Sequence, residues 1–262
     1  MRHQSIKSHK QHKYVMHTDN NIPNPEQQPS QALYPHVSID CVILGFDGDS
    51  LQVLLSQPDK DSVGNGFTRA KLPGRLLYAE EDPEDAASDI INQLTGTRNH
   101  YVKQFRAFGS PTRTSNPKDV HWLESIIRQK VGRIVTIAYL SLVKINNRTH
   151  RKFAGFDAEW HKLSELPELA FDHHEIIAEV LKELDELSGL QPQIIFEMLP
   201  AKFTALQLRH LYEQISGKEI DVRNFSKLVL SKPYIIPLDE WEQNVSHRAA
   251  RYYKFQASRT KM

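Results

Sequence analysis

The stretch from Leu72 to Gly96 constrains the fold of this chain more than any other. A Leu-Pro-Gly turn ends at Gly74 and leads into an acidic loop. Asp82-Pro83 then has the form of a helix start, since aspartate supplies a capping oxygen and proline the first-turn φ. Apolar residues recur at helical spacing over residues 84–94. The stretch therefore predicts a loop followed by an amphipathic helix.

This outline resembles the Nudix box, G-x5-E-x7-R-E-U-x-E-E-x-G-U, where U is a bulky aliphatic residue. In that family the loop and helix hold a divalent cation, usually magnesium, on a diphosphate, using helix carboxylates one turn apart. Gly74, Glu80 and Ile90 fit the pattern, and Asp89 is a shorter acid where the pattern has glutamate.

The other box positions depart from the pattern. Asn92 and Gln93 replace the paired glutamates, Ser88 replaces the arginine and Thr95 the glycine. Magnesium strongly favours carboxylate oxygens when it bridges to phosphate, so two of the expected charges are missing. The acids that remain lie in the loop and first helical turn, where they also complement the helix dipole: Glu80, Glu81, Glu84 and Asp85.

Composition narrows the class of protein. No apolar run approaches the length of about 18 residues needed to span a bilayer, and the N-terminus lacks a hydrophobic signal core. We expect a cytoplasmic protein with no membrane contact. The single cysteine, Cys41, cannot form an internal disulfide and is interpreted as core packing. Although the net charge is only +1, residues 244–262 contain basic side chains and no acid, which suits phosphate binding or a solvated tail.

The chain divides into three predicted segments. Residues 1–33 are polar and lack apolar periodicity, as expected of a disordered tail. Residues 34–188 alternate predicted strands with the box helix and a second helix. The strands are expected at Val37–Leu44, Leu51–Leu55, Tyr101–Phe108 and Arg133–Lys144, with a turn at Asn146-Asn147 and a connection over Trp160–Leu169. The first two should form a hairpin. Asp172, with Glu175 three residues on, predicts a capping box at the second helix.

Residues 189–262 have a different pattern. The segment Ser188–Pro192 should end the preceding helix, and Gln193–Leu199 is expected to form a short one. Thr204 and Gln207 predict a capped helix that stops at Ser216–Lys218. A helix over 221–230 should bury Val222, Phe225, Leu228 and Val229. Two strands around a loop complete a winged helix-turn-helix. The predicted fold class is α+β, a Nudix-type α/β/α sandwich followed by that domain.

Several motifs together resemble the Nudix-related transcriptional regulators of the NrtR and AraR type, over residues 34–256. They are Leu72–Gly74 with the altered box, Gly132–Tyr139, Leu169–Glu175, Phe203–Leu208 and Gly217–Phe225. The resemblance implies a non-catalytic Nudix domain that binds a small effector, and a winged helix that binds double-stranded operator DNA, usually in a homodimer. It favours a repressor, with ADP-ribose or a pentose such as L-arabinose as effector. Neither enzyme activity, nor a metal, nor a cofactor is expected.

The predicted site residues follow from this mode of action. DNA contacts are expected from the outward side chains of the helix over 221–230 and from the wing. Arginine and lysine read guanine, asparagine reads adenine, and arginines of the wing can hold phosphates. The predicted contacts are Arg223, Asn224, Lys227, His247, Arg248 and Arg251. Effector contacts are expected from Lys71, Arg75, Glu80, Arg113 and Tyr139. His173-His174 is interpreted as structural or effector-contacting, since adjacent helix residues point apart and do not form a metal site.

Three alternatives stay open. A pentose ranks slightly ahead of ADP-ribose, because the lost carboxylates remove the usual magnesium bridge to a diphosphate. A working hydrolase of ADP-ribose and related nucleoside diphosphates, with Glu80 and Asp89 as metal ligands, is the rival class of protein. The winged helix could also be a protein-interaction module.

Overall fold

The computed structural model describes residues 36–57, 69–96, 101–145, 152–153, 156–246 and 248–257, which belong to one compact unit. Three predictions fall outside these residues: the disordered tail over 1–33, the turn at Asn146-Asn147, and the DNA contact of His247. Among the described helices, none is long and apolar enough to cross a membrane.

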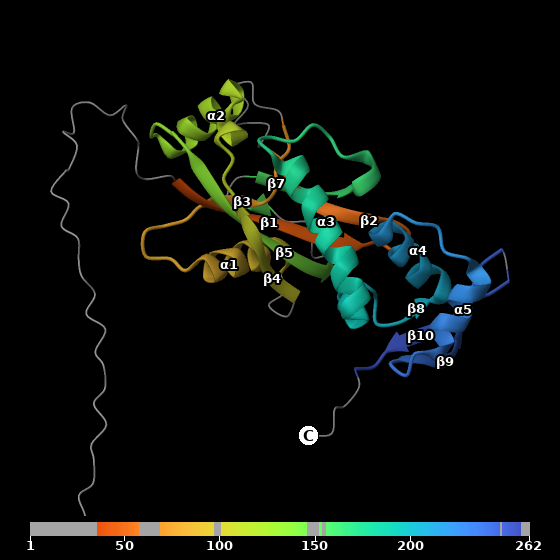
Figure 1. The fold of residues 1–262 in the computed structure, drawn as a ribbon. Coiled ribbons are helices and arrows are strands. Elements are labelled where there is room, and N and C mark those ends of the chain that lie inside the picture. The colour runs from red at the N-terminus through yellow and green to blue at the C-terminus, as the bar shows by residue number, and fades with distance from the viewer. Residues whose placement is uncertain are drawn as a thin grey trace, which may run out of the picture. The chain divides into compact units, whose positions relative to one another are not determined.

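A mixed sheet forms the centre of the first domain (Figure 1). Its order is β4-β5-β1-β2-β7-β6, and β3 also pairs with β1. The strands are β1 (His36–Phe46), β2 (Leu51–Gln57), β3 (Gly74–Leu76), β4 (Tyr101–Phe108), β5 (Ile134–Lys144), β6 (Lys152–Phe153) and β7 (Phe156–Lys162). The β1–β2 hairpin is confirmed, and β1 runs parallel to β5 from His36 opposite Ile134 to Phe46 opposite Lys144.

Alternation along β1 divides the core into two layers. Ile39, Cys41 and Ile43 pack with the apolar side of α1 (Pro83–Thr95), while Val42 and Leu44 belong to the cluster that contains α3 (His173–Leu190). The two helices cover the sheet and complete the predicted α/β/α sandwich (Figure 1). Cys41 is fully buried, and burial raises the pKa of its thiol, which agrees with core packing.

Several elements of this domain differ from the prediction, which included neither β3 nor β6. Trp160 lies in β7, which pairs with β2 as far as Lys162, so the predicted connection begins too early; the 3-10 turn η4 (Leu163–Glu165) follows it. Helix α2 (Pro117–Ile127), preceded by the 3-10 turn η3 (Pro111–Thr114), was not predicted. Its start has a sequence signal, because the side chain of Asn116 accepts the Lys118 amide proton and proline occupies the first turn.

The predicted capping box at Asp172 is wrong. The Asp172 carboxylate makes no cap hydrogen bond and instead forms an ion pair with Arg113, because tertiary charge competes with the free amides of the helix start. The other end of α3 lies inside the predicted terminating segment, where Pro192 follows Gln191. The predicted domain boundary between residues 188 and 189 falls in the last turn of this helix.

The C-terminal elements form a winged helix. They are η5 (Pro192–Glu197), β8 (Phe203–Thr204), α4 (Ala205–Ser216), α5 (Val222–Ser231), β9 (Ile235–Trp241) and β10 (Arg251–Phe255), with a sheet of order β8-β10-β9. The capping box of Thr204 and Gln207 is confirmed. Phe225 and Val229 of α5 are buried, but Val222 and Leu228 are 58% and 48% exposed, because only the face that includes the 225/229 pair meets the core. The predicted burial of Val222 and Leu228 is therefore wrong.

Candidate functional site

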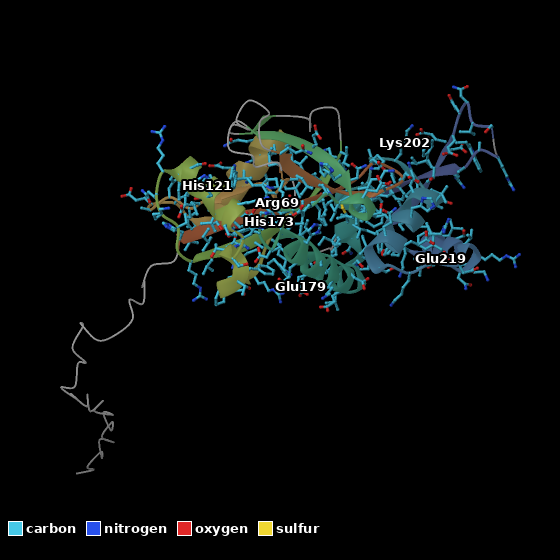
Figure 2. All side chains as sticks on the ribbon, turned by 90° about the horizontal axis from the view of Figure 1, so that it is seen from above. Arg69, His121, His173, Glu179, Lys202 and Glu219 are labelled. Atoms are coloured by element: carbon cyan, nitrogen blue, oxygen red, sulfur yellow. The ribbon has the colours of Figure 1, made fainter. Side chains whose placement is uncertain are left out.

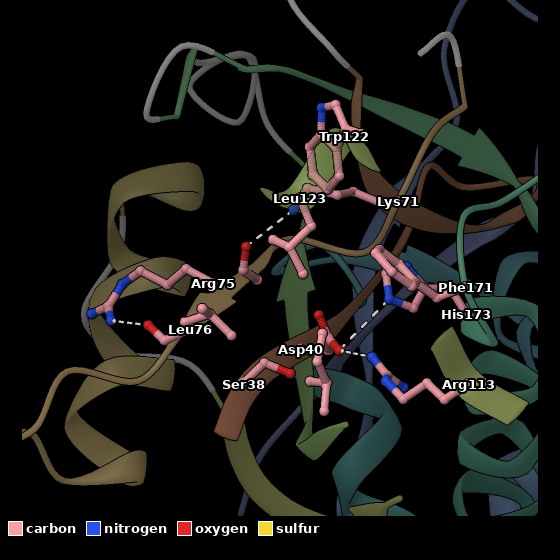
Figure 3. A pocket seen from close by; sticks show the side chains of 12 residues that line it. Ser38, Asp40, Lys71, Arg75, Leu76, Arg113, Trp122, Leu123, Phe171 and His173 are labelled. Carbon is pink, nitrogen blue, oxygen red and sulfur yellow. Dashed lines mark hydrogen bonds and ion pairs between the residues drawn. The ribbon is translucent and has the colours of Figure 1, made fainter. Parts of the chain in front are cut away.

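A cavity of about 50 Å³ lies where β1 and β5 begin, on the side of the sheet opposite α1 (Figure 3). It brings together three of the five predicted effector residues, Lys71, Arg75 and Arg113. The other lining residues were not among the predicted contacts, apart from the role left open for His173: Ser38, Asp40, Gly74, Leu76, Trp122, Leu123, Ile134, Phe171 and His173.

The charged centre of this cavity is Asp40. Arg113 Nη2 donates to Asp40 Oδ2 at 2.8 Å, and the same guanidinium reaches Asp172. His173 Nε2 is 3.6 Å from the same Asp40 oxygen. Burial alone raises the pKa of Asp40, but His173 and Arg113 more than offset this and hold the pKa well below its usual range. The carboxyl group is therefore ionised and paired inside the core.

His173 connects the start of α3 to the Leu-Pro-Gly turn. Its Nδ1 accepts the Leu72 amide proton at 2.9 Å, so in the neutral ring Nε2 carries the proton and faces Asp40. The neighbouring His174 is exposed. Gly74 contributes by its small size, since a Cβ there would clash with the Ile39 carbonyl and the Asp40 carboxylate. The turn can therefore lie directly against Asp40 only with glycine at this position.

Lys71 directly precedes the Leu72–Gly74 turn and Arg75 directly follows it, and both residues line the cavity. Lys71 Nζ donates to the carbonyls of Gly74 at 3.0 Å and Leu72 at 3.3 Å, and lies 5.8 Å from the Trp122 ring centroid. Burial lowers the pKa of Lys71. Arg75 pairs with Glu81, and this hydrogen bonding raises the pKa of Arg75. Both cations are thus oriented by partners within the loop.

Two buried polar atoms around the cavity, Ser38 Oγ and Arg113 Nε, have no hydrogen-bond partner, and His173 Nε2 has only its 3.6 Å contact with Asp40. An unpaired buried polar group costs about 1–3 kcal/mol, so it is usually satisfied by water or a ligand. Arginine Nε and the protonated histidine nitrogen are donors. The cavity is therefore suited to a ligand group rich in acceptors.

A second, polar cavity of about 270 Å³ adjoins the first and shares Arg113 and Phe171 with it. Its remaining lining residues are mostly hydroxyl-bearing or charged: Arg69, Ser110, Thr112, Ser115, Asn116, Asp119, Asp172 and Glu175. Phe171 lines both spaces, and its backbone has the left-handed conformation, with φ of 54°. Asp119 holds it there by accepting the Phe171 amide proton at 2.9 Å and is itself paired with Arg69.

Glu80 and Tyr139 do not reach either cavity. Glu80 is exposed in the loop before α1. Tyr139 lies opposite Cys41 in the sheet, so its side chain is buried on the α1 side, where the hydroxyl donates to Gln104 Oε1 at 3.3 Å. The resemblance to the Nudix family implied a position for both residues by the effector, but strand register separates Tyr139 from Asp40.

The box helix lacks the carboxylates that the pattern places at residues 92 and 93. Asn92 Oδ1 is buried without a hydrogen-bond partner, whereas Gln93 and Asp89 are exposed. Within the described ranges, no three side chains of His, Cys, Asp or Glu gather closely enough to hold a metal ion. Asp85 and Asp89 are exposed one turn apart on this helix, but residues 92 and 93 supply amides in place of the carboxylates that would bridge a cation to a diphosphate.

The predicted DNA-contact residues of α5 form an exposed face. Arg223, Asn224 and Lys227 are all exposed, and the Asp221 side chain caps the helix by accepting the Asn224 amide proton at 2.9 Å. Lys202 and Glu219 mark this end of the molecule, far from His121 of α2 (Figure 2).

The wing is less basic than its sequence indicated. Arg248 is exposed, whereas Arg251 is half-buried, donates through Nε to the Leu238 carbonyl at 2.6 Å and lies over the Trp241 ring. The neighbouring strand β9 carries Asp239 and Glu240, and Glu242 directly follows it. Glu240 pairs with Lys202, and the Glu242 carboxylate accepts the Ala250 amide proton at 3.0 Å.

The same two-part architecture occurs in known proteins. Residues 195–255 match the family model described as the NrtR DNA-binding winged helix domain. The chain is 23% identical over 234 residues to the ADPR responsive transcriptional repressor NtrR of Acinetobacter baylyi, covering 88% of this chain and 86% of the relative.

Solved structures agree in fold. NrtR of Shewanella oneidensis, in complex with a 27mer DNA, matches with a TM-score of 0.62 and 21% identity over 84% of this chain and 93% of that one. A MutT/nudix family protein of Enterococcus faecalis matches with a TM-score of 0.59 and 21% identity over 88% and 96%. The predicted fold class, a Nudix-type sandwich followed by a winged helix, is confirmed.

Proposed function

We propose that this chain, a Nudix-related protein of the NrtR type, is a transcriptional repressor whose winged helix binds operator DNA and whose Nudix domain binds ADP-ribose without hydrolysing it. The observation that carries the proposal is the pairing, in one chain, of an NrtR-type winged helix with a box helix that lacks the paired carboxylates.

The DNA-binding surface is α5 together with the wing. Arg223, Asn224 and Lys227 enter the major groove, where arginine reads guanine and asparagine reads adenine. Arg248 contacts phosphate from the wing, while Arg251, already bonded to the Leu238 carbonyl, supports the wing's shape as well as its charge. The assembly is a homodimer, so two α5 helices meet half-sites about one helical turn apart.

The effector binds at the cavity beside Asp40. The relative's description as ADPR responsive supports ADP-ribose ahead of a pentose. Lys71, Arg75 and Arg113 line it, and a diphosphate would compete with Asp40, Asp172 and Glu81 for the two arginines, which takes the place of a magnesium bridge. A ligand of nucleotide size requires a pocket of at least about 300 Å³. The effector therefore extends from the 50 Å³ cavity into its 270 Å³ neighbour, displacing Phe171. A pentose, which would fit the second cavity alone, is the alternative.

The experiment is a DNA-binding titration with the effectors as variables. Duplexes selected by the protein from a random pool are labelled, and affinity is measured by fluorescence anisotropy with ADP-ribose, NAD or L-arabinose. We expect sequence-specific binding that falls steeply with salt and weakens at least fivefold with ADP-ribose alone. Salt-insensitive or absent DNA binding would contradict the proposal and support a protein-interaction module. If DNA binding responds to L-arabinose and not to ADP-ribose, the effector is the pentose instead of ADP-ribose.

The rival function, a working hydrolase, is tested on the same preparation. We expect release of AMP or phosphate from ADP-ribose with magnesium to stay at background. Turnover clearly above background, abolished by Glu80→Gln or Asp89→Asn, would overturn the non-enzymatic assignment. Restoring both glutamates in N92E/Q93E asks whether only charge is missing, and we expect that variant to gain a magnesium-dependent rise in melting temperature that wild type lacks.

A further inference from the structure

The turn between β1 and β2 is a preformed unit. Asp47 Oδ1 accepts the amide protons of Asp49 at 2.9 Å and Ser50 at 2.7 Å, and the Asp47 amide donates to the Ser50 carbonyl at 3.3 Å. A turn closed by its own side chain resists bending. It therefore moves together with the strands that it joins.

Helix α4 of the winged helix is hydrogen-bonded to this turn through Gln214. Gln214 Oε1 accepts the Leu51 amide proton at 2.6 Å, and Gln214 Nε2 donates to the Asp49 carbonyl at 2.6 Å. His210 Nδ1 lies 3.8 Å from Asp49 Oδ1. One side-chain amide thus uses both its donor and its acceptor on two backbone groups 163 and 165 residues away in sequence. Such a two-point contact specifies orientation as well as proximity.

Strand β1 connects the turn held by Gln214 to the proposed effector cavity. Its opening half carries Ser38 and Asp40, and its last residue is Phe46, just before the turn. Pairing with β5 along all 11 residues makes the strand a stiff element. At about 3.3 Å per residue, the cavity and the turn are roughly 20–25 Å apart. On the far side of α4, Tyr212 packs against Phe225 of α5 with ring centroids 5.9 Å apart.

We propose that Gln214 is the positioning residue through which effector occupancy changes the orientation of α5, the helix that carries Arg223, Asn224 and Lys227. When the effector displaces the partners of Asp40, the paired strands β1 and β5 move together and carry the turn with them. Gln214 then reorients α4, and with it α5, out of register with DNA. This inference rests on the proposed function and adds the contact that transmits the signal.

The test is a thermodynamic cycle on the full chain. DNA affinity is measured with and without saturating ADP-ribose, and ADP-ribose affinity is measured by calorimetry without DNA. In Gln214→Ala we expect each separate affinity to stay within about twofold of wild type, while the effect of ADP-ribose on DNA binding falls from at least fivefold to less than twofold. A merely structural contact would change the separate affinities or the melting temperature instead.

Two further variants sharpen the result. Gln214→Glu has the same shape and keeps the acceptor for Leu51 but loses the donor to Asp49, so it should retain only part of the coupling. Gln193→Ala removes an exposed glutamine elsewhere and should behave as wild type. Wild-type coupling in both Gln214 variants would overturn the role of Gln214 and leave the proposed function intact. Absence of coupling in wild type itself would overturn the proposed function.

Discussion

At the scale of single residues, the buried charges beside Asp40 are the most informative group. Asp40 and Arg113 are 5% and 6% exposed, so each depends on the other for compensation. Removing one partner of a buried pair leaves an uncompensated charge, which costs more than the pair contributes.

We therefore predict that Arg113→Ala lowers the free energy of unfolding by about 3–5 kcal/mol. Chemical denaturation with urea measures this directly. Arg106→Ala is the matched control, because Arg106 also pairs with an acid, Glu179, but is half exposed, so its loss should cost about 1 kcal/mol or less. Equal losses in the two variants would contradict the assigned role of burial.

Asp40 also predicts a dependence on pH. Its pKa is lower in the folded than in the unfolded chain, so its ionised form stabilises the fold above about pH 4, and this contribution is lost as pH falls further. We expect the melting temperature to fall between pH 5 and pH 3, and to fall less in Asp40→Asn. Other paired acids whose pKa is lowered, such as Glu81 and Glu213, account for the remaining slope. Identical slopes in both proteins would rule out Asp40 as a contributor.

At the scale of elements, the backbone conformation at the end of a helix determines whether a glycine there is needed for stability. Gly217 ends α4 in the left-handed region with φ of 67°, where a side chain is strained. Gly189 lies within α3, and a Cβ there would meet nothing within 4 Å.

We predict opposite effects of the same substitution at these two sites. Gly217→Ala should destabilise the chain by about 1–2 kcal/mol, because alanine is strained at positive φ. Gly189→Ala should stabilise it by up to about 1 kcal/mol, because alanine favours the helix. Urea midpoints of the two variants give the comparison, and a shift of the same sign in both would show that the assigned backbone conformations are incorrect.

Helix α5 carries the prediction about DNA. Replacing the exposed Arg223 by alanine should weaken operator binding by about 1–3 kcal/mol and relax sequence preference at one position. Anisotropy titrations against the selected duplex and its single-base variants measure both effects. Arg106→Ala changes net charge equally but lies on β4, so it should bind as wild type. Wild-type affinity of Arg223→Ala would remove this residue from the interface.

At the scale of the whole molecule, the effector should stabilise the fold by mass action. At 100 times its dissociation constant, ADP-ribose should add about 2.7 kcal/mol to the free energy of unfolding. Thermal melts with ADP-ribose, NAD and pentoses measure this. If the melting temperature rises with L-arabinose and not with ADP-ribose, the pentose becomes the preferred candidate effector. Light scattering of the same samples should give the mass of a dimer, and a monomer at all concentrations would exclude the paired half-site arrangement.

Local sequence patterns determined the elements whose physics is local. Alternation in residues 37–44 predicted β1, and the Asp82-Pro83 start predicted α1, because capping and side-chain periodicity act within a few residues. Thr204 and Gln207 likewise predicted the start of α4. The amides at Asn92 and Gln93 show from the sequence alone that the box lacks two of the pattern's carboxylates.

Only the tertiary structure decided the site. The cavity depends on strand register and on a helix, α2, whose Trp122 sits more than 80 positions from Ser38 in sequence. The free amides at the start of α3 were plausible local partners for Asp172, yet it pairs with Arg113. A hydrogen bond to a buried cation is stronger than one to an exposed amide. Tyr139 and Asp40 were separated by the pleat of the sheet. The box was visible in the sequence, but the groups that surround its first glycine came together only when β1, α2 and α3 packed around it.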